Sequence, residues 1–274
     1  MKIDLHMHSN YSDGCMKVAD LAKYAYNKSL NVVALTDHDT VLGVNEMIKE
    51  CDKYNIRVIP AMELTTTYMG EDCHIVSLFK ELTPELVRFS YEQESKRKKR
   101  AILMLNRIKD IYNVKIDLDL LENERTITRK NMLANILKCN DLDYDYARTL
   151  TSRESKAYVP FSYLSVEDGI NFIHNNGGIA ILAHPCLIKR KESIQELMNY
   201  NFDGIEAIYS NEKNDEKYFN ELASKHNLLV SAGSDFHGDK SHGDMGSVSL
   251  SEEGLNLILN KLQMIYVVIT HYNA

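Results

Sequence analysis

Short apolar segments that each lead to a histidine or an acidic residue recur along this chain of 274 residues. They are residues 32–35 before His38, 57–61 before Glu63, 179–182 before His184 and 228–231 before Asp235. Nearly continuous apolar strands that alternate with amphipathic stretches are typical of a parallel α/β sheet covered by helices. The C-terminal ends of such strands share one face of a (β/α) barrel, whereas an open sheet gathers groups only at one switch point. We therefore predict an α/β fold that closes into a barrel.

The predicted elements alternate regularly outside the middle of the chain. We expect strands at 3–8, 32–35, 57–61, 73–79, 179–182, 204–208 and 228–231, and helices at 16–28, 43–54, 166–175, 192–200 and 215–226. A terminal helix and a strand near 264–269 follow. In the first strand, the period of two places His6 and His8 on the same face. About seven strands are expected, so the barrel need not be the eight-stranded form.

Residues 84–160 interrupt this alternation with helices alone. Thr83, Pro84 and Glu85 have the residue types of an N-cap, a first-turn proline and a first-turn acid, and helical segments follow at 86–111, 131–139 and 144–150. We predict a barrel made of residues 1–83 and 161–274, with 84–160 as a helical insertion that serves as a substrate-recognition cap. The insertion holds 16 Lys and Arg against 12 Asp and Glu, and the remainder holds 16 against 27. A basic insertion on an acidic barrel suits an anionic substrate, although the basic run 96–100 is interpreted as a solvated helix face.

Composition narrows the classes of protein that this chain can belong to. The net charge of -7 disfavours nonspecific binding of nucleic acid by the whole surface. The five cysteines form no CxxC pair, which indicates a reducing compartment, and we expect Cys73 and Cys186 to be buried free thiols. The N-terminus lacks the features of a signal peptide, and no apolar run approaches the ~20 residues of a membrane span. We expect a cytoplasmic protein without membrane contact or an obligate protein partner.

Nine residues beside the expected strands have side chains that bind metal ions. They are His6, His8, Asp13, His38, Glu63, His74, His184, Asp235 and His237. Six imidazoles and three carboxylates exceed what one ion needs, so the set predicts two or three divalent ions, and its N and O donors fit Mn, Fe or Zn. Clustered ions lower the pKa of a bound water and neutralise phosphate oxygens during hydrolysis. No Gly-x-Ser-x-Gly, Walker A or Gly-x-Gly-x-x-Gly motif offers an alternative chemistry.

The order of these motifs resembles that of the PHP (polymerase and histidinol phosphatase) family. The motifs are His-x-His at 6–8, Ser-Asp-Gly at 12–14, Thr-Asp-His-Asp at 36–39, Glu63, His74, Ala-His-Pro at 183–185 and Gly-Ser-Asp-Phe-His at 233–237. The resemblance covers residues 1–80 and about 160–240, and the insertion is similar to that of stand-alone bacterial phosphoesterases. It implies a distorted (β/α)7 barrel with a helical insertion and three metal ions.

The resemblance also implies how the ligands are divided among the ions. His6, His8, Glu63 and Asp235 would hold the first ion, Glu63, His74 and His184 the second, and Asp13, His38 and His237 the third, with Glu63 bridging. All nine family positions are matched. Asn10-Tyr11 in the first motif departs from the family pattern, as does Asn211-Glu212-Lys213 where relatives often have a histidine. These departures leave the choice of substrate open.

The insertion carries the candidate substrate contacts. Thr128-Arg129-Lys130 corresponds to a Gly-Arg-Pro-His segment of the family, and Arg129 offers a forked donor suited to phosphate, with a surface ion pair as the alternative. Lys130 and Lys156 are further candidates for phosphate binding. Tyr158 either stacks on a base or packs internally.

The resemblance predicts a phosphoric ester hydrolase that uses two or three divalent ions. Its expected substrates are small and phosphorylated: nucleotides such as 3′,5′-nucleoside bisphosphates, or the 5′ ends of short oligoribonucleotides. Histidinol-phosphate phosphatase is the alternative within the family. A non-catalytic, metal-stabilised module is the alternative from another class, and the complete ligand set argues against it.

Overall fold

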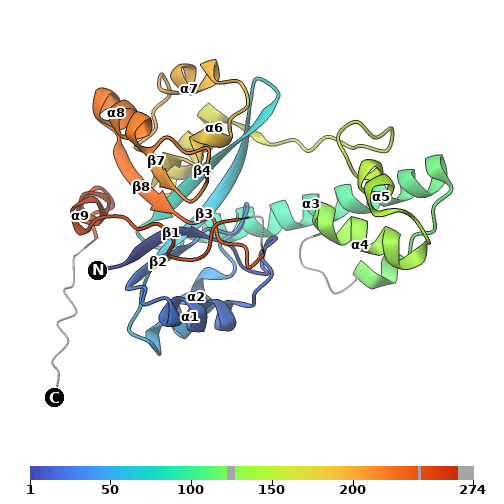
Figure 1. Ribbon diagram of the computed structural model, residues 1–274, viewed down its shortest axis with the longest axis horizontal. Coiled ribbons are helices and arrows are strands. Elements are labelled where there is room, and N and C mark those ends of the chain that lie inside the picture. Colours follow the sequence, from blue (N-terminus) through green and yellow to red (C-terminus); the bar gives the residue numbers. More distant parts are fainter. Residues whose placement is uncertain (122–126, 240–241, 265–274) are drawn as a thin grey trace.

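Seven strands follow one path around a sheet that almost closes on itself in this computed structural model, which describes residues 1–121, 127–239 and 242–264 (Figure 1). In order around the sheet they are β1 (Ile3–Met7), β2 (Val32–Leu35), β3 (Arg57–Tyr68), β4 (Glu71–Phe79), β6 (Gly178–Leu182), β7 (Gly204–Tyr209) and β8 (Leu229–Gly233). The short β5 (Leu164–Ser165) pairs with β3 beside this path. Backbone hydrogen bonds from His8 to Phe236 (2.8 Å) and from Asp235 to His6 (2.9 Å) join the last strand to the first. The prediction of a distorted barrel is confirmed.

The hairpin of β3 and β4 differs from the parallel sheet that we predicted. β4 runs antiparallel to both β3 and β6, so the sheet is mixed. β3 continues to a two-residue turn at Met69 and Gly70, whose φ angles of 49° and 80° are those of a hairpin turn with left-handed residues. Methionine is unusual there, so the sequence lacks the Asn-Gly or Asp-Gly pair that marks such a turn. Because β4 runs backwards, its early residue His74, which pairs with Thr65, lies near the end of β3 that carries Glu63.

Helices cover the outside of the sheet in two groups (Figure 1). α1 (Val18–Asn27) and α2 (Val44–Asp52) lie beside β1 and β2, while α6 (Val166–Asn175), α7 (Glu192–Leu197) and α8 (Glu216–His226) cover β4, β6 and β7. In α6, Ile170 and Ile173 are buried at helical spacing and Glu167 is exposed, so one stripe faces the sheet. The covering helices therefore form where the sequence alternates between strand and amphipathic patterns.

The inner face of the barrel is apolar away from the ligand-bearing end. Ile59 and Ala61 of β3 and Val76 of β4 belong to one buried cluster that draws on several strands. α9 (Glu252–Lys261) contributes Leu255 and Ile258 to the same cluster. The period of two in β3 continues from these residues to Glu63, which therefore points to the inside of the barrel.

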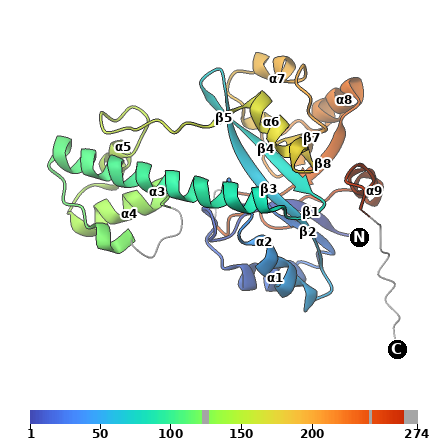
Figure 2. The same ribbon diagram turned by 180° about the vertical axis from the view of Figure 1, so that it is seen from behind.

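The helices within residues 84–160 form a lobe at the side of the barrel, seen from both directions in Figures 1 and 2. The lobe contains α3 (Pro84–Tyr112), the 3₁₀ helix η1 (Leu118–Leu121), α4 (Arg129–Cys139) and α5 (Tyr144–Leu150). The Thr83 side chain accepts a hydrogen bond from the backbone of Leu86, which confirms the predicted N-cap. The lobe has an apolar cluster of its own, built on residues such as Leu105, Ile108 and Ile136. α3 and the segment after α5 connect it to the barrel.

Other predictions concern single segments. Cys73 and Cys186 are buried free thiols, as expected. A second 3₁₀ helix, η2 (Pro185–Leu187), follows β6. The expected strand near 264–269 lies outside the described residues from residue 265 onward. None of the helices in the described part of the chain has the length and apolar character needed to cross a bilayer.

Candidate metal centre

All nine predicted ligands lie together at one end of the barrel. β1 carries His6 and leads to His8 and Asp13, His38 follows β2, Glu63 is in β3, His74 is in β4, His184 follows β6, and Asp235 and His237 follow β8. Six strands thus contribute to one cluster at the face where the parallel strands of the barrel have their C-terminal ends, while the antiparallel β4 contributes His74 from near its N-terminal end. The internal distances of this cluster divide it into three overlapping groups.

The deepest group consists of His6, His8, Glu63 and Asp235, all of them buried. Glu63 Oε2 lies 3.4 Å from His6 Nε2 and 3.2 Å from His8 Nε2. Asp235 Oδ1 lies 3.3 Å and 3.1 Å from the same two nitrogens. The two nitrogens are 3.2 Å apart. Four donor atoms therefore converge as they do around a divalent cation.

Glu63 connects this group to the other histidines. Its Oε1 lies 3.0 Å from His74 Nδ1 and 2.8 Å from His184 Nε2, while its Oε2 lies 3.1 Å from His38 Nδ1. Both carboxylate oxygens thus face imidazole nitrogens, on different sides. This geometry suits a carboxylate shared between two ions.

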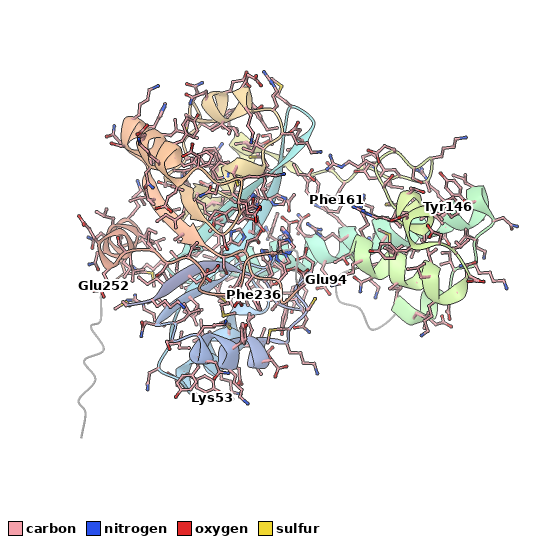
Figure 3. The ribbon with its side chains drawn as sticks, in the orientation of Figure 1. Lys53, Glu94, Tyr146, Phe161, Phe236 and Glu252 are labelled. Atoms are coloured by element: carbon pink, nitrogen blue, oxygen red, sulfur yellow. The ribbon has the colours of Figure 1, made fainter. Side chains whose placement is uncertain are left out.

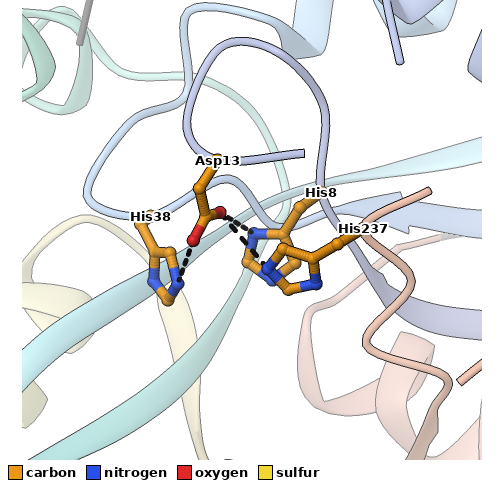
Figure 4. A group of neighbouring side chains, drawn as sticks. All are labelled: His8, Asp13, His38 and His237. Carbon is orange, nitrogen blue, oxygen red and sulfur yellow. Dashed lines mark ion pairs between the residues drawn. The ribbon is translucent and has the colours of Figure 1, made fainter. Parts of the chain in front are cut away.

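The outer group surrounds Asp13, whose side chain is 34% exposed (Figure 4). Its carboxylate lies 3.2 Å from His237 Nε2 and 3.7 Å from both His38 Nε2 and His8 Nδ1. His237 Nδ1 lies 2.8 Å from the backbone oxygen of Asp235 and donates to it, which directs Nε2 towards Asp13. This group is the one most open to solvent.

Several of these close approaches are not hydrogen bonds. Four buried nitrogen and oxygen atoms have no hydrogen-bond partner. They are His38 Nδ1, Glu63 Oε2, His74 Nδ1 and Asp235 Oδ1. A buried polar atom without a partner costs about 1–3 kcal/mol, so four in one cluster require an explanation. Divalent cations bound between these atoms would satisfy all four. The residues present therefore fit metal ions, and their nitrogen and oxygen donors suit Mn, Fe or Zn.

The charges of the cluster also favour bound cations. Burial alone would raise the pKa of Glu63, but the neighbouring imidazoles, His38 foremost, hold that pKa well below its usual range. Burial opposes the charged form of His8, yet the nearby carboxylates of Asp235 and Glu63 raise its pKa to about 10. Burial lowers the pKa of His38 to about 4 against the attraction of Glu63 and Asp13. The carboxylates are thus ionised at neutral pH and attract positive charge into the barrel.

Glu206 in β7 is a buried carboxylate that our sequence interpretation missed. Its Oε1 lies 2.9 Å from His6 Nδ1, and its Oε2 accepts the backbone N–H of His184 at 2.7 Å. The first contact keeps the proton on Nδ1 of His6, so that Nε2 is free to face Glu63 and Asp235. A charged residue in the middle of an apolar strand was the signal that could have revealed it.

Two glycines allow the backbone and side chains of the cluster to pack this closely. A Cβ on Gly233 would lie 2.2 Å from His6 Cβ and 2.4 Å from Glu206 Oε1. A Cβ on Gly14 would lie 2.4 Å from the backbone oxygen of His8. Both distances are far below a van der Waals contact, so each position requires glycine.

Further buried groups hold the ligand-bearing segments in place. Asp37 accepts hydrogen bonds from the Ser9 backbone (2.8 Å), the Ser9 hydroxyl (2.6 Å) and the Ser12 hydroxyl (2.6 Å), and so fixes the loop after β1. The Tyr209 hydroxyl donates to Asp235 Oδ2 at 2.9 Å, which leaves Oδ1 to face the histidines. The sequence interpretation did not assign a role to Asp37 or Tyr209.

A cavity of about 260 Å³ opens beside the outer group. Asp13, His38 and His74 form part of its wall. The other lining residues are mainly basic or aromatic: Arg97, Arg100, Arg129, Arg153, Tyr158, Phe161 and Tyr163. These residues come from α3, from the start of α4 and from the segment after α5, so the lobe and the segment that returns from it line the cavity together with the predicted ligands.

Two of the predicted substrate residues line this cavity. Arg129 borders both the cavity and a neighbouring groove of about 860 Å³. Tyr158 borders the cavity as well, but the guanidinium carbon of Arg100 lies 5.3 Å from the centre of its ring. One face of Tyr158 therefore packs on an arginine.

The two predicted lysines lie in other surroundings. Lys130 Nζ donates to Cys15 Sγ at 3.1 Å, which brings the start of α4 against the loop after β1. Lys156 is exposed, and its backbone N–H donates to the Tyr112 hydroxyl at 3.1 Å. Their roles in substrate binding stay predictions.

The basic run 96–100 is only partly the solvated helix face that we expected. Lys96 and Lys99 are exposed, but Arg97 is only 21% exposed and forms an ion pair with Asp39. The prediction is wrong for Arg97, because the packing of α3 against the barrel turns this side chain inward, and it is wrong for Arg100, which is half-buried, lines the cavity and donates to the backbone oxygen of Val159 at 2.6 Å. Charge patterning along a helix does not reveal which residue will face a neighbouring lobe.

Comparison with known proteins agrees with this geometry. The PHP domain matches residues 4–208 of the chain. The chain is 28% identical over 247 residues to the 5′-3′ exoribonuclease Rnm of Escherichia coli, covering 85% of this chain and 84% of the relative. It is 25% identical over 250 residues to the 3′,5′-nucleoside bisphosphate phosphatase of Chromobacterium violaceum, covering 86% of this chain and 87% of the relative.

The fold is also found among solved structures. A candidate metal-dependent phosphoesterase from Bifidobacterium adolescentis superposes with a TM-score of 0.80 at 22% identity, covering 94% of this chain and 96% of that one. At this identity the likeness shows the shared fold, including the mixed, nearly closed sheet.

Proposed function

Because this chain belongs to the PHP domain family and, like its relatives, is a metal-dependent phosphoesterase, we propose that it hydrolyses phosphate esters of nucleotides. The proposed substrates are 3′,5′-nucleoside bisphosphates or the 5′ ends of short oligoribonucleotides. The names of the two curated relatives support these two classes, and the basic, aromatic-lined cavity beside the ligands suits both. An alternative substrate such as histidinol phosphate lacks an observation in its favour.

The convergence of nine side chains on one buried cluster carries this proposal. We assign His6, His8, Glu63 and Asp235 to a first ion, Glu63, His74 and His184 to a second, and Asp13, His38 and His237 to a third. Bound ions would supply positive charge and an activated water at the phosphate. The four buried donor atoms without hydrogen-bond partners support this assignment.

The protein's own residues would divide the remaining work. Glu63 keeps the groups of ligands together, since its two oxygens face different histidines. Asp13 and His38 lie on the wall of the cavity and therefore border the position of a bound phosphate. Arg129, which lines the same cavity from the lobe, offers a forked donor to a second phosphate or to the nucleotide backbone.

We also propose that residues 84–160 act as a cap that selects the substrate. The lobe supplies most of the basic and aromatic wall of the cavity, whereas the barrel supplies the ligands. A cavity of about 260 Å³ between the barrel and the lobe can hold a small phosphorylated molecule. The neighbouring groove shares Asp72, Arg129 and Arg153 with the cavity and offers room for a longer chain.

The proposal is tested by a hydrolysis panel with added Mn or Zn. The panel contains adenosine 3′,5′-bisphosphate, a short 5′-phosphorylated RNA, histidinol phosphate and an aryl phosphate. We expect release of product from one of the first two at the highest kcat/KM. Preference for histidinol phosphate would contradict the proposed substrate class.

Variants separate metal chemistry from contaminating activity. Asp13→Ala and His38→Ala should abolish turnover while the far-UV circular dichroism stays that of the parent. Asp20→Ala, an exposed aspartate of α1, is the matched control and should retain full activity. Parental rates in both ligand variants would show that the outer group has no part in catalysis.

A further inference from the structure

The cavity beside the predicted ligands and the neighbouring groove meet at an ion pair. Asp72 in β4 pairs with Arg153 in the segment after α5, and both side chains line the cavity of about 260 Å³ and the groove of about 860 Å³. Figure 3 shows Phe161, which also lines the cavity, at the junction between the barrel and the helical lobe. The ion pair therefore joins the barrel to the segment that returns from the lobe, at the boundary between the two spaces.

The cavity and the groove differ in charge. Among the described residues, four arginines line the cavity against the two aspartates Asp13 and Asp72. The described lining of the groove holds four basic side chains against the four carboxylates of Glu71, Asp72, Asp145 and Glu154. Grooves that follow a single-stranded nucleic acid are positively charged. The groove thus has room for a longer chain but lacks the charge that would attract one.

A chain that continues from the cavity into the groove has to pass the ion pair. The carboxylate of Asp72 lies at the boundary, and a phosphate that approached it would meet a like charge. Arg153 is 40% exposed and Asp72 is 39% exposed, and ion pairs with this exposure shift an equilibrium by at most about fivefold. The pair can therefore open, at a small cost that a substrate held within the cavity does not incur.

We propose that the ion pair between Asp72 and Arg153 is a specificity determinant that disfavours substrates longer than one nucleotide. This inference rests on the proposed function and concerns the choice between its two substrate classes. The pair takes no part in breaking the phosphate ester. It acts on whether a chain can extend from the cavity into the groove, and so on the KM of longer substrates.

The test compares two substrates, adenosine 3′,5′-bisphosphate and a 5′-phosphorylated pentaribonucleotide, at equal metal loading. Asp72→Asn removes the charge and keeps the shape of the side chain. We expect the ratio of kcat/KM for the pentaribonucleotide to that for the bisphosphate to rise about fivefold, through a lower KM for the pentaribonucleotide.

The chain offers a matched control for this variant. Glu196 is 38% exposed and pairs with Arg190, which is 41% exposed, and neither residue lines the cavity or the groove. Glu196→Gln should therefore leave the substrate ratio at its parental value.

Exchange of the two residues tests the pairing itself. The double variant Asp72→Arg with Arg153→Asp restores an ion pair of opposite polarity and should return the ratio towards the parental value. Arg153→Asp alone places two carboxylates at the boundary and should lower the ratio below that of the parent. If the exchanged variant kept the high ratio of Asp72→Asn, the pairing would be irrelevant and the proposal would be overturned.

A binding measurement makes the test independent of turnover and of the ions. It is needed because Asp72 stands two residues before the predicted ligand His74. In calorimetry with metal-free protein, Asp72→Asn should bind the pentaribonucleotide about fivefold more tightly than the parent does. Parental affinity for the pentaribonucleotide together with a parental substrate ratio would overturn the proposal.

The same data distinguish this inference from the proposed function. If the parent hydrolysed neither nucleotide while Asp72→Asn bound the pentaribonucleotide more tightly, the substrate assignment would fail and the role of the ion pair would stand. If the parent hydrolysed the bisphosphate and Asp72→Asn had the parental ratio, only the inference about the ion pair would fail.

Discussion

Replacement of Glu206 by glutamine tests how the buried carboxylate prepares His6 for metal binding. Glu206 accepts from His6 Nδ1 at 2.9 Å and from the His184 backbone at 2.7 Å, and therefore needs two acceptor oxygens. Glutamine keeps only one acceptor and puts an amide NH₂ in place of the other. Either the His184 N–H meets this NH₂, or His6 changes tautomer and carries its proton on Nε2, the nitrogen that faces Glu63 and Asp235.

The expected loss can be estimated from these contacts. Removing a hydrogen-bond partner that orients a metal-binding histidine costs about 10-fold to 100-fold in metal affinity or activity. The charge of Glu206 is also removed, and among the groups that oppose the effect of burial on the pKa of His6 this charge is the largest. We therefore expect Mn affinity to fall towards the upper end of this range, with a loss of stability of about 1–3 kcal/mol for the unsatisfied buried group.

The assay is a competition titration of Mn between the protein and a chelator of known affinity. Glu253→Gln makes the same chemical change on the exposed first turn of α9 and should bind Mn as the parent does. Denaturant unfolding of both variants separates metal affinity from folding. Glu206→Gln protein that bound Mn as tightly as the parent would refute the argument that Glu206 sets the tautomer of His6.

Three further predictions follow from the same cluster. Gly233→Ala should abolish metal binding, measured by the same titration, because its Cβ would lie 2.2 Å from His6 Cβ and 2.4 Å from Glu206 Oε1; parental Mn affinity would contradict this packing. Since the pKa of metal-free His8 is raised to about 10 and that of His6 also lies well above its usual range, protons that they carry at neutral pH must leave when Mn binds, so apparent affinity should rise at least about tenfold per pH unit between pH 6 and 9. Calorimetry in buffers of different ionisation enthalpy measures this release, and zero net proton release would disprove the charge assignment. Arg129→Ala should raise KM for adenosine 3′,5′-bisphosphate more than for an aryl phosphate, and an equal effect on both would exclude Arg129 from recognition of the second phosphate.

The barrel could be predicted from the sequence because each strand has a recognisable apolar pattern within a few consecutive residues. Runs such as 179–182 are apolar on both faces, because one face packs inside the barrel and the other packs against helices. Each run ends at a predicted ligand, because the polar end of the barrel begins there. The β3–β4 hairpin was missed for an equally local reason. Its turn uses Met69 before Gly70, and methionine carries no preference for a left-handed conformation.

The parts of the site that escaped prediction depend on tertiary contacts. Arg97 looks like its neighbours Lys96 and Lys99 in sequence, and only the docking of α3 decides which of them meets the cavity. Glu206 and Asp37 carry no motif, although a charge within or beside an apolar strand is a usable signal. The nine predicted ligands could be found from the sequence, because each stands in a short, chemically distinctive segment.

The central claim is that side chains from distant segments hold several divalent ions around Glu63. Anomalous diffraction from crystals equilibrated with Mn, recorded near the Mn absorption edge, tests it directly. We predict two or three peaks within coordination distance of the nine ligand side chains, with Glu63 between two of them. Crystals that bind Mn fully at other sites but show no peak in this cluster would contradict the account. A single peak that Glu63 does not contact would contradict it as well.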